Sequence, residues 1–110
     1  MAIIIHIYYT GTGGSARAYV REMLSSGLVD SIRAEAGNLR YDYFFPAEDE
    51  ETVLLIDGWK DQAALDLHHA LPVMAQIARL REKYGLRMRV ERYAPVEEAF
   101  SAADQQYIVK

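Results

Sequence analysis

The side chains best suited to chemistry lie in one stretch, between Val53 and Pro72. An apolar run with the sequence VLLIDGW ends at Trp59, and a histidine pair, His68 and His69, follows shortly before Pro72. Imidazole is the one side chain that titrates near neutrality when its surroundings do not perturb it. The order of residues could therefore bring an aromatic face and a proton-transferring group to the same pocket.

Composition excludes several classes of function. The chain has 110 residues, of which 51% are hydrophobic, the size at which one domain buries its own core. It has no cysteine, which excludes disulfides, thiolate zinc sites and a thiol nucleophile, and which fits a cytoplasmic location. With a net charge of −4 and no basic stripe, the chain is not expected to bind nucleic acid.

Metal and cofactor sites with a recognisable spacing are missing. Adjacent histidines on a helix point about 100° apart, so His68 and His69 cannot chelate one ion as an i, i+4 pair could. No Gly-x-Gly-x-x-Gly separates a strand from a helix, and the glycine-rich turn at residues 11–14 has no Walker lysine. We therefore expect neither a metal nor an organic cofactor.

Hydrophobic periodicity predicts the order of the elements. The first nine residues lack the basic start and cleavage site of a secretory signal and are typical of a strand. No apolar run approaches the roughly 20 residues of a membrane helix, so no membrane contact is expected. The remaining pattern predicts a helix at 15–36 with a slight bend at 25–27, strands at 39–45 and 53–59, a helix capped by Asp61 and running to His69, a helix from Pro72 that Gly85 ends, and a strand at 86–93.

This order predicts a ferredoxin-like α+β sandwich, a four-stranded antiparallel sheet with helices on one face. Residues 1–95 would form this domain and residues 96–110 a C-terminal tail. Both strands of the central hairpin carry large apolar side chains on their two faces, and helices can cover only one face. We therefore expect a homodimer, a dimeric α+β barrel in which two sheets pack face to face. The end of the tail, QYIVK, could add to a sheet edge of its own chain or of the partner.

Three segments resemble the antibiotic biosynthesis monooxygenase family, in particular its quinol monooxygenase-like branch: RAEAGNLRY from Arg33, DGWKD from Asp57 and HHALP from His68. The resemblance covers nearly all of residues 3–93. It implies a cofactor-independent monooxygenase that oxidises a small quinol or aromatic substrate with dioxygen. In such chemistry the protein deprotonates an electron-rich phenol and the anion reduces dioxygen, so a base and an apolar pocket suffice.

Other activities on the same scaffold remain alternatives. The resemblance to haem-degrading relatives fails at their functional positions, because the first strand has no asparagine and the short helix carries His68 where they have tryptophan. Isomerisation of a phosphosugar would require converging basic residues, which the sequence does not supply. A non-catalytic dimeric protein that binds a small hydrophobic molecule, or an isomerase, would use the same fold.

The resemblance also implies a set of site residues. His68 is the candidate base, and the residues expected to contact substrate are Trp59, Tyr41, Tyr43, His69 and His6. Each has a structural alternative: Trp59 could fill the gap between sheet and helix, His68 could interact with the last carbonyls of its helix, and His6 could be a hydrogen-bonded histidine within a strand. The tyrosines are also typical of half-buried strands and of subunit interfaces.

Overall fold

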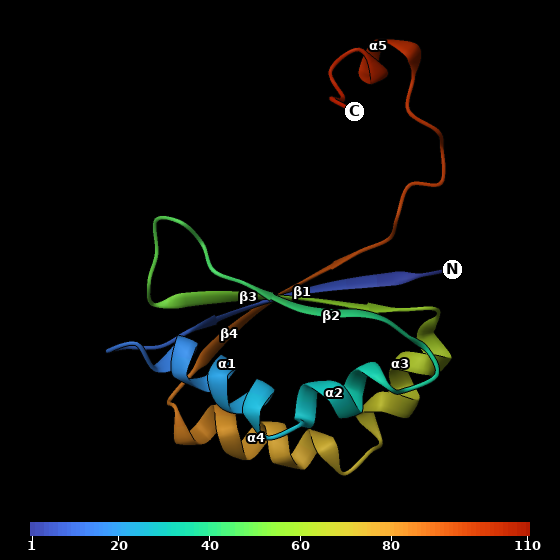
Figure 1. Ribbon diagram of the computed structural model, residues 1–110. Coiled ribbons are helices and arrows are strands. Elements are labelled where there is room, and N and C mark those ends of the chain that lie inside the picture. Colours follow the sequence, from blue (N-terminus) through green and yellow to red (C-terminus); the bar gives the residue numbers. More distant parts are fainter.

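The computed structural model describes residues 1–110 and contains a four-stranded antiparallel sheet with helices beneath one of its faces (Figure 1). The strands lie in the order β2-β3-β1-β4, which together with the element order confirms the predicted ferredoxin-like α+β fold. The strands are β1 (Ile3–Thr10), β2 (Asn38–Phe44), β3 (Thr52–Trp59) and β4 (Arg87–Tyr93). The helices are α1 (Ser15–Ser25), α2 (Leu28–Arg33), α3 (Gln62–His69), α4 (Val73–Lys83) and α5 (Ala102–Gln105).

The ends of α3 and α4 are set by the residues that the sequence indicates. The carboxylate of Asp61 accepts a hydrogen bond from the backbone amide of Ala64 at 2.8 Å, which caps the start of α3. After α4, Gly85 has a φ of 61°, and its amide donates to the carbonyl of Glu82 at 3.1 Å. The next amide donates to the carbonyl of Arg81 at 3.0 Å, which completes a Schellman motif. Both helix ends are therefore fixed locally.

The expectation of one bent helix over residues 15–36 is wrong. The helix stops at Ser25, and a second helix begins at Leu28, because Gly27 adopts a left-handed conformation with a φ of 84°. Glycine adopts this conformation without a Cβ penalty, so it interrupts the helix where a bend was expected. Both pieces lie on the same side of the sheet (Figure 1).

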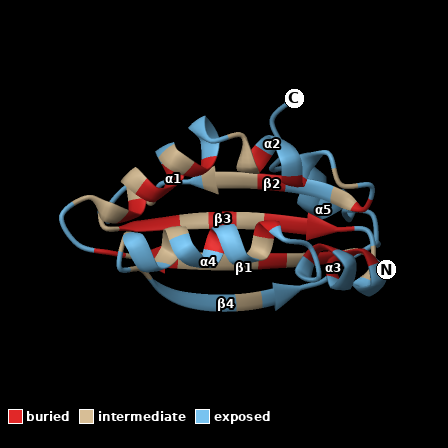
Figure 2. Ribbon diagram, turned by 90° about the horizontal axis from the view of Figure 1, so that it is seen from below, coloured by how far each residue is buried: buried red, intermediate tan, exposed pale blue.

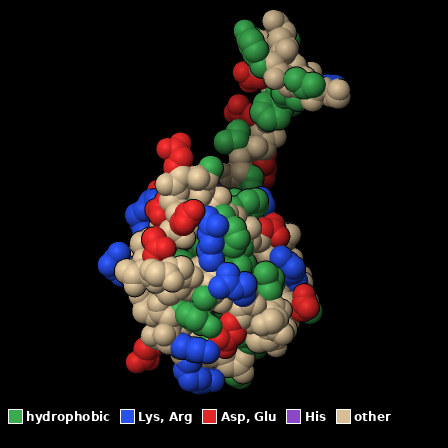
Figure 3. Space-filling model, turned by 60° about the vertical axis from the view of Figure 1, so that its left-hand side comes forward, with side chains coloured by type: hydrophobic (Ala, Val, Ile, Leu, Met, Phe, Trp, Pro, Cys, Tyr) green, Lys and Arg blue, Asp and Glu red, His purple; other side chains and the backbone are tan.

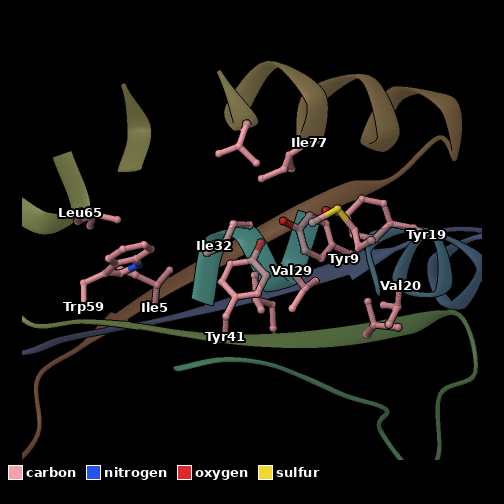
Figure 4. Packing of buried hydrophobic residues seen from close by; sticks show 14 of the residues in the cluster. Ile5, Tyr9, Tyr19, Val20, Val29, Ile32, Tyr41, Trp59, Leu65 and Ile77 are labelled. Carbon is pink, nitrogen blue, oxygen red and sulfur yellow. The ribbon is translucent and has the colours of Figure 1, made fainter. Parts of the chain in front are cut away.

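Side-chain alternation gives the sheet two different faces. The face towards the helices contributes Tyr9, Tyr41, Leu55 and Trp59 to a core in which each is at most 2% exposed. Most of β3 is buried, whereas β4, at the edge of the sheet, is largely exposed (Figure 2). Helix residues such as Ile77 point towards this face from the opposite layer (Figure 4).

No helix packs against the second face, which we call the open face (Figure 1). Strand pairing aligns its residues, and it includes large apolar side chains that are half-buried or exposed: Ile4, Tyr8, Phe44, Leu54, Ile56 and Tyr93. Charged side chains lie among them, and Arg89 stacks over Tyr8 at 4.0 Å. Tyr41 and Tyr43 belong to the helix side instead, so within one chain they are not available to an interface on the open face.

After β4 the chain leaves the sheet on the side opposite to the helices (Figure 1). Residues 94–110 stand away from the body, with apolar side chains along their length (Figure 3). Val96 is 81% exposed, Tyr107 86% and Val109 96%. The segment forms the short α5 and pairs with no strand of its own sheet. No helix of the structure has the length and apolar character needed to cross a membrane.

A close approach of backbone to helix joins the start of β2 to α3. Gly37 is buried, and a Cβ at this position would overlap the Cβ of Ala64. The carbonyl of Gly37 accepts a hydrogen bond from the amide of Lys60 at 2.9 Å, which holds the two segments together. Glycine is therefore required here by packing rather than by its backbone conformation.

We predict that Gly37→Ala lowers the free energy of unfolding by about 1–3 kcal/mol, because the added methyl overpacks this contact. Ala64→Gly removes the overlapping atom at a helix cost of about 1 kcal/mol. In urea unfolding, the double variant should therefore be less destabilised than the sum of the two single variants. Strict additivity would contradict the proposed contact.

Candidate active site

A cavity of about 360 Å³ lies between the sheet and helices α3 and α4. Its volume falls within the roughly 300–1,000 Å³ that small-molecule sites occupy. The sheet forms one wall, mainly through β1 and β4 with Tyr41 of β2 and Asp57 of β3, and the two helices form the other. Most of its lining is apolar and includes Ile5, Ile7, Leu65, Met74, Ile77 and Val90.

His68 lines this cavity, and a carboxylate forms a hydrogen bond with its Nδ1. Its side chain is 4% exposed, and Nδ1 lies 2.9 and 3.1 Å from the two carboxylate oxygens of Glu35, in the turn after α2. Because an ionised carboxylate can only accept, Nδ1 carries the hydrogen. In the neutral ring this leaves the lone pair on Nε2, which makes no hydrogen bond within the chain. The arrangement gives His68 a defined tautomer and one nitrogen able to take up a proton.

Trp59 lies behind the imidazole. The two rings stack at 4.5 Å with an interplanar angle of 29°, and the indole is fully buried. Its Nε1 donates to Oδ1 of Asp57 at 2.5 Å. Trp59 does not line this cavity, and its stacking supports the His68 ring from the side; it lines a separate pocket together with Glu35 and Ala64.

Asp57 places a second titratable group on the cavity wall. It is 5% exposed, and burial raises the pKa of its carboxyl from 3.8 to about 6. The hydrogen bond from Trp59 and the nearby His68 act in the opposite direction, and the Glu35 carboxylate adds to the rise. The carboxyl can therefore gain or lose a proton close to neutral pH, beside the imidazole.

Two tyrosines supply hydroxyl groups to the cavity. Tyr9 and Tyr41 both line it, and burial raises the pKa of each phenol well above its usual value of 10.0. Both hydroxyls therefore stay protonated and can donate hydrogen bonds to an oxygen atom of a bound molecule. Tyr43 packs edge-on against Tyr41 at 5.9 Å and does not line the cavity.

The two other histidines occupy different environments. His69 is exposed and contributes to the rim of the cavity, 5.7 Å from the ring of His68. His6 lies on the open face, where its ring packs at a tilt against Tyr93 with centroids 4.7 Å apart, so the sheet separates it from the cavity. The structure thus brings His68, His69 and Tyr41 to one cavity and leaves His6 outside it.

Sequence reasoning missed three charged residues at this site. Asp57 lies on the same face of its strand as Leu55 and Trp59, so the sequence alternation could have predicted that it is buried. Arg81 follows Ile77 by one helical turn on an apolar stripe and also lines the cavity. Glu35 lies in an irregular turn, where no periodicity indicates its contact with α3. No group of three or more His, Cys, Asp or Glu side chains is arranged to hold a metal ion.

Comparison with known proteins links this site to a family. The sequence model of the antibiotic biosynthesis monooxygenase family matches residues 2–80. The Bacillus subtilis protein YcnE, provisionally named a monooxygenase, is 40% identical over 45 residues, which is 41% of this chain. That match spans 47% of YcnE, about half its length.

Solved structures share the fold. A Deinococcus radiodurans structure, provisionally named an antibiotic biosynthesis monooxygenase, has a TM-score of 0.76 at 21% identity, covering 90% of this chain and 97% of its own. A Pseudomonas aeruginosa protein has a TM-score of 0.73 at 28% identity, covering 86% and 94%. SnoaB of Streptomyces nogalater, a cofactor-independent oxygenase, has a TM-score of 0.70 at 13% identity, covering 88% and 95%.

The raised pKa of Asp57 predicts a specific pH dependence of stability. Since the folded pKa exceeds the unfolded one, the neutral carboxyl contributes fully to stability below about pH 4, and this contribution is lost as the pH rises through about 6. Asp57→Asn keeps an oxygen for Trp59 and cannot ionise. Between pH 4 and pH 8, its free energy of unfolding should rise relative to the parent by about 1–3 kcal/mol.

Urea unfolding at the two pH values measures this difference. Asp66→Asn is the matched control, because Asp66 is an exposed carboxylate on α3. It should show no comparable change relative to the parent. A difference that stays constant with pH for Asp57→Asn would contradict the assigned environment.

Proposed function

Because the chain belongs to the antibiotic biosynthesis monooxygenase family, we propose that it is a cofactor-independent monooxygenase that oxidises a small quinol or related aromatic phenol with dioxygen. The observation that carries the proposal is the partly buried Glu35–His68 pair, whose histidine lies at the wall of an apolar cavity. Deprotonation of a phenol requires a base in a defined tautomer beside an apolar pocket. We place the reaction in the cytoplasm, since the chain has no cysteine to crosslink.

In this mechanism the phenol hydroxyl of the substrate gives its proton to Nε2 of His68. Glu35 is a positioning residue, because its carboxylate holds Nδ1–H and stabilises the imidazolium that forms. The electron-rich phenolate then reduces dioxygen directly. One oxygen atom enters the ring, and the other leaves as water with two substrate hydrogens, so the quinol supplies all the electrons.

Other parts of the cavity serve orientation. The hydroxyl of Tyr41, kept protonated by burial, donates to an oxygen of the substrate. His69 contacts substrate at the rim. The apolar side chains of β1 and α4 exclude water from the phenolate and hold the ring in one orientation.

We further propose that the working form is a homodimer built on the open face. A second copy would cover the exposed apolar side chains, including Phe44 at 43% and Tyr93 at 47% exposure. The same face carries both signs of charge, with Arg40 beside Asp42 and Arg89 beside Glu91. Such a face can match opposite charges with its own copy across a two-fold axis.

The tail, residues 96–110, is the second part of the dimer proposal. It starts on the side of the open face, makes no strand pairing with its own sheet and exposes apolar side chains (Figures 1 and 3). A partner subunit would bury them. Residues 1–95 form the catalytic domain in this arrangement, and the tail contacts the other subunit.

Oxygen uptake across a panel of hydroquinones and naphthols tests the oxygenase proposal. We expect saturable uptake by the parent protein and a loss of about 10²–10⁴-fold in kcat/KM for His68→Gln, because a general base contributes on that scale. Asp66→Asn changes an exposed side chain of the same helix that does not line the cavity, and as the matched control it should leave kcat/KM unchanged.

Each other result assigns a different function. Tight binding of a phenol without oxygen uptake would favour a non-catalytic binding protein. Turnover that proceeds equally well without oxygen would indicate an isomerase. Uptake that is unchanged in a correctly folded His68→Gln variant would remove His68 as the base.

Deletion of Gln105 to Lys110 tests the role of the tail. These residues include the exposed Tyr107 and Val109, so their loss should weaken the dimer, measured as a higher dissociation constant in sedimentation equilibrium. A Gln105→Ala variant of the full-length chain controls for a change at the cut site alone. An unchanged dissociation constant after the deletion would reject a contact between the tail and the partner.

A further inference from the structure

Arg81 is a cationic side chain on the cavity wall that has no anionic partner. It lies on the face of α4 that also carries Met74 and Ile77, and all three line the cavity. The ion pairs of the structure use other arginines and a lysine. Its Nε is buried without a hydrogen-bond partner, and its Nη1 contacts only the thioether sulfur of Met88, at 2.6 Å. A thioether is a weak acceptor, so most of the donor capacity of this guanidinium is unused.

The second arginine of the cavity donates a hydrogen bond to an oxygen atom. Arg92 reaches the cavity from β4, but its Nη2 donates to the side-chain oxygen of Gln62 at 2.5 Å. Arg79, two residues before Arg81 and so about 200° around the helix from it, is exposed and does not line the cavity. Arg92 also pairs with Ile5, which places it at the same end of the cavity as Asp57, whereas Arg81 lies near Met88 and Tyr9. Arg81 is therefore the arginine available at the end of the cavity remote from Asp57.

The base and Arg81 lie at opposite ends of the cavity. His68 stacks on Trp59 and is close to Asp57, which pairs with Ile5 of β1. Arg81 contacts Met88, which pairs with Tyr9 of the same strand.

Ile5 and Tyr9 are four residues apart on β1, which corresponds to about 13 Å at roughly 3.3 Å per residue. A bound molecule could therefore meet the imidazole with one end and the guanidinium with the other.

We propose that the substrate is a phenol or quinol that carries a carboxylate at the end remote from its reacting hydroxyl, and that Arg81 binds this carboxylate. The guanidinium fork matches a carboxylate with two parallel hydrogen bonds. This inference deepens the proposed function and rests on it for the phenol end.

Binding of 6-hydroxy-2-naphthoate and of its methyl ester, measured by calorimetry without oxygen, tests the proposal. The two ligands share a ring and a remote hydroxyl and differ in the negative charge. We expect the parent to bind the acid about 10–100-fold more tightly than the ester, as expected for hydrogen bonds between charged groups. Arg81→Gln should abolish this preference while it retains ester binding, and Arg79→Gln should leave both affinities unchanged.

The outcomes separate this inference from the oxygenase proposal. Equal affinity of the parent for acid and ester, no binding of the acid, or an equal loss for both ligands in Arg81→Gln would overturn the role of Arg81. If uncharged quinols draw oxygen but Arg81→Gln does not change acid selectivity, the oxygenase proposal stands and this inference fails. If acid selectivity depends on Arg81 but no substrate draws oxygen, the carboxylate site stands and the oxygenase proposal fails.

Discussion

Two hydrogen bonds inside the helix-covered layer hold polar side chains where apolar ones would ordinarily pack. Glu35 binds His68, and Trp59 binds Asp57. A buried polar group without a partner costs about 1–3 kcal/mol, so each pair must keep its geometry for the fold to tolerate it. The contact of Gly37 with Ala64 brings the turn that carries Glu35 against α3, and the cap at Asp61 fixes where α3 starts. The local fold and the site thus depend on the same few contacts.

The cavity joins two electrostatic environments within one apolar space. At one end, two carboxyl groups surround an imidazole, and burial makes one of them titrate near neutrality. At the other end, a guanidinium lies near tyrosines that burial keeps neutral. The sheet keeps these ends apart because they lie at different positions along β1. The sheet itself therefore sets the orientation of a bound molecule, without a loop that closes over it.

Local signals in the sequence predicted most elements, because periodicity and caps act over a few residues. Asp61 and Gly85 marked helix ends, and alternation identified the strands. The effect of Gly27 on the helix was underestimated. A glycine within an apolar helical pattern can either continue the helix or adopt a left-handed conformation that ends it, and tertiary packing decides between the two.

At the site, the sequence indicated His68 but not the partner that orients it. Glu35 and His68 are far apart in the chain, and only the tertiary fold brings them together. The position of Trp59 was ambiguous for the same reason: a strand-end tryptophan can face a cavity or support a neighbouring ring. Asp57 could have been recognised, because the neighbouring residues on its face of the strand are all buried.

Trp59 is the one tryptophan of the chain, and it contacts the imidazole that faces the cavity. The tryptophan fluorescence of the protein therefore comes from a single indole that contacts the candidate base, so this emission reports on the surroundings of His68 without any label.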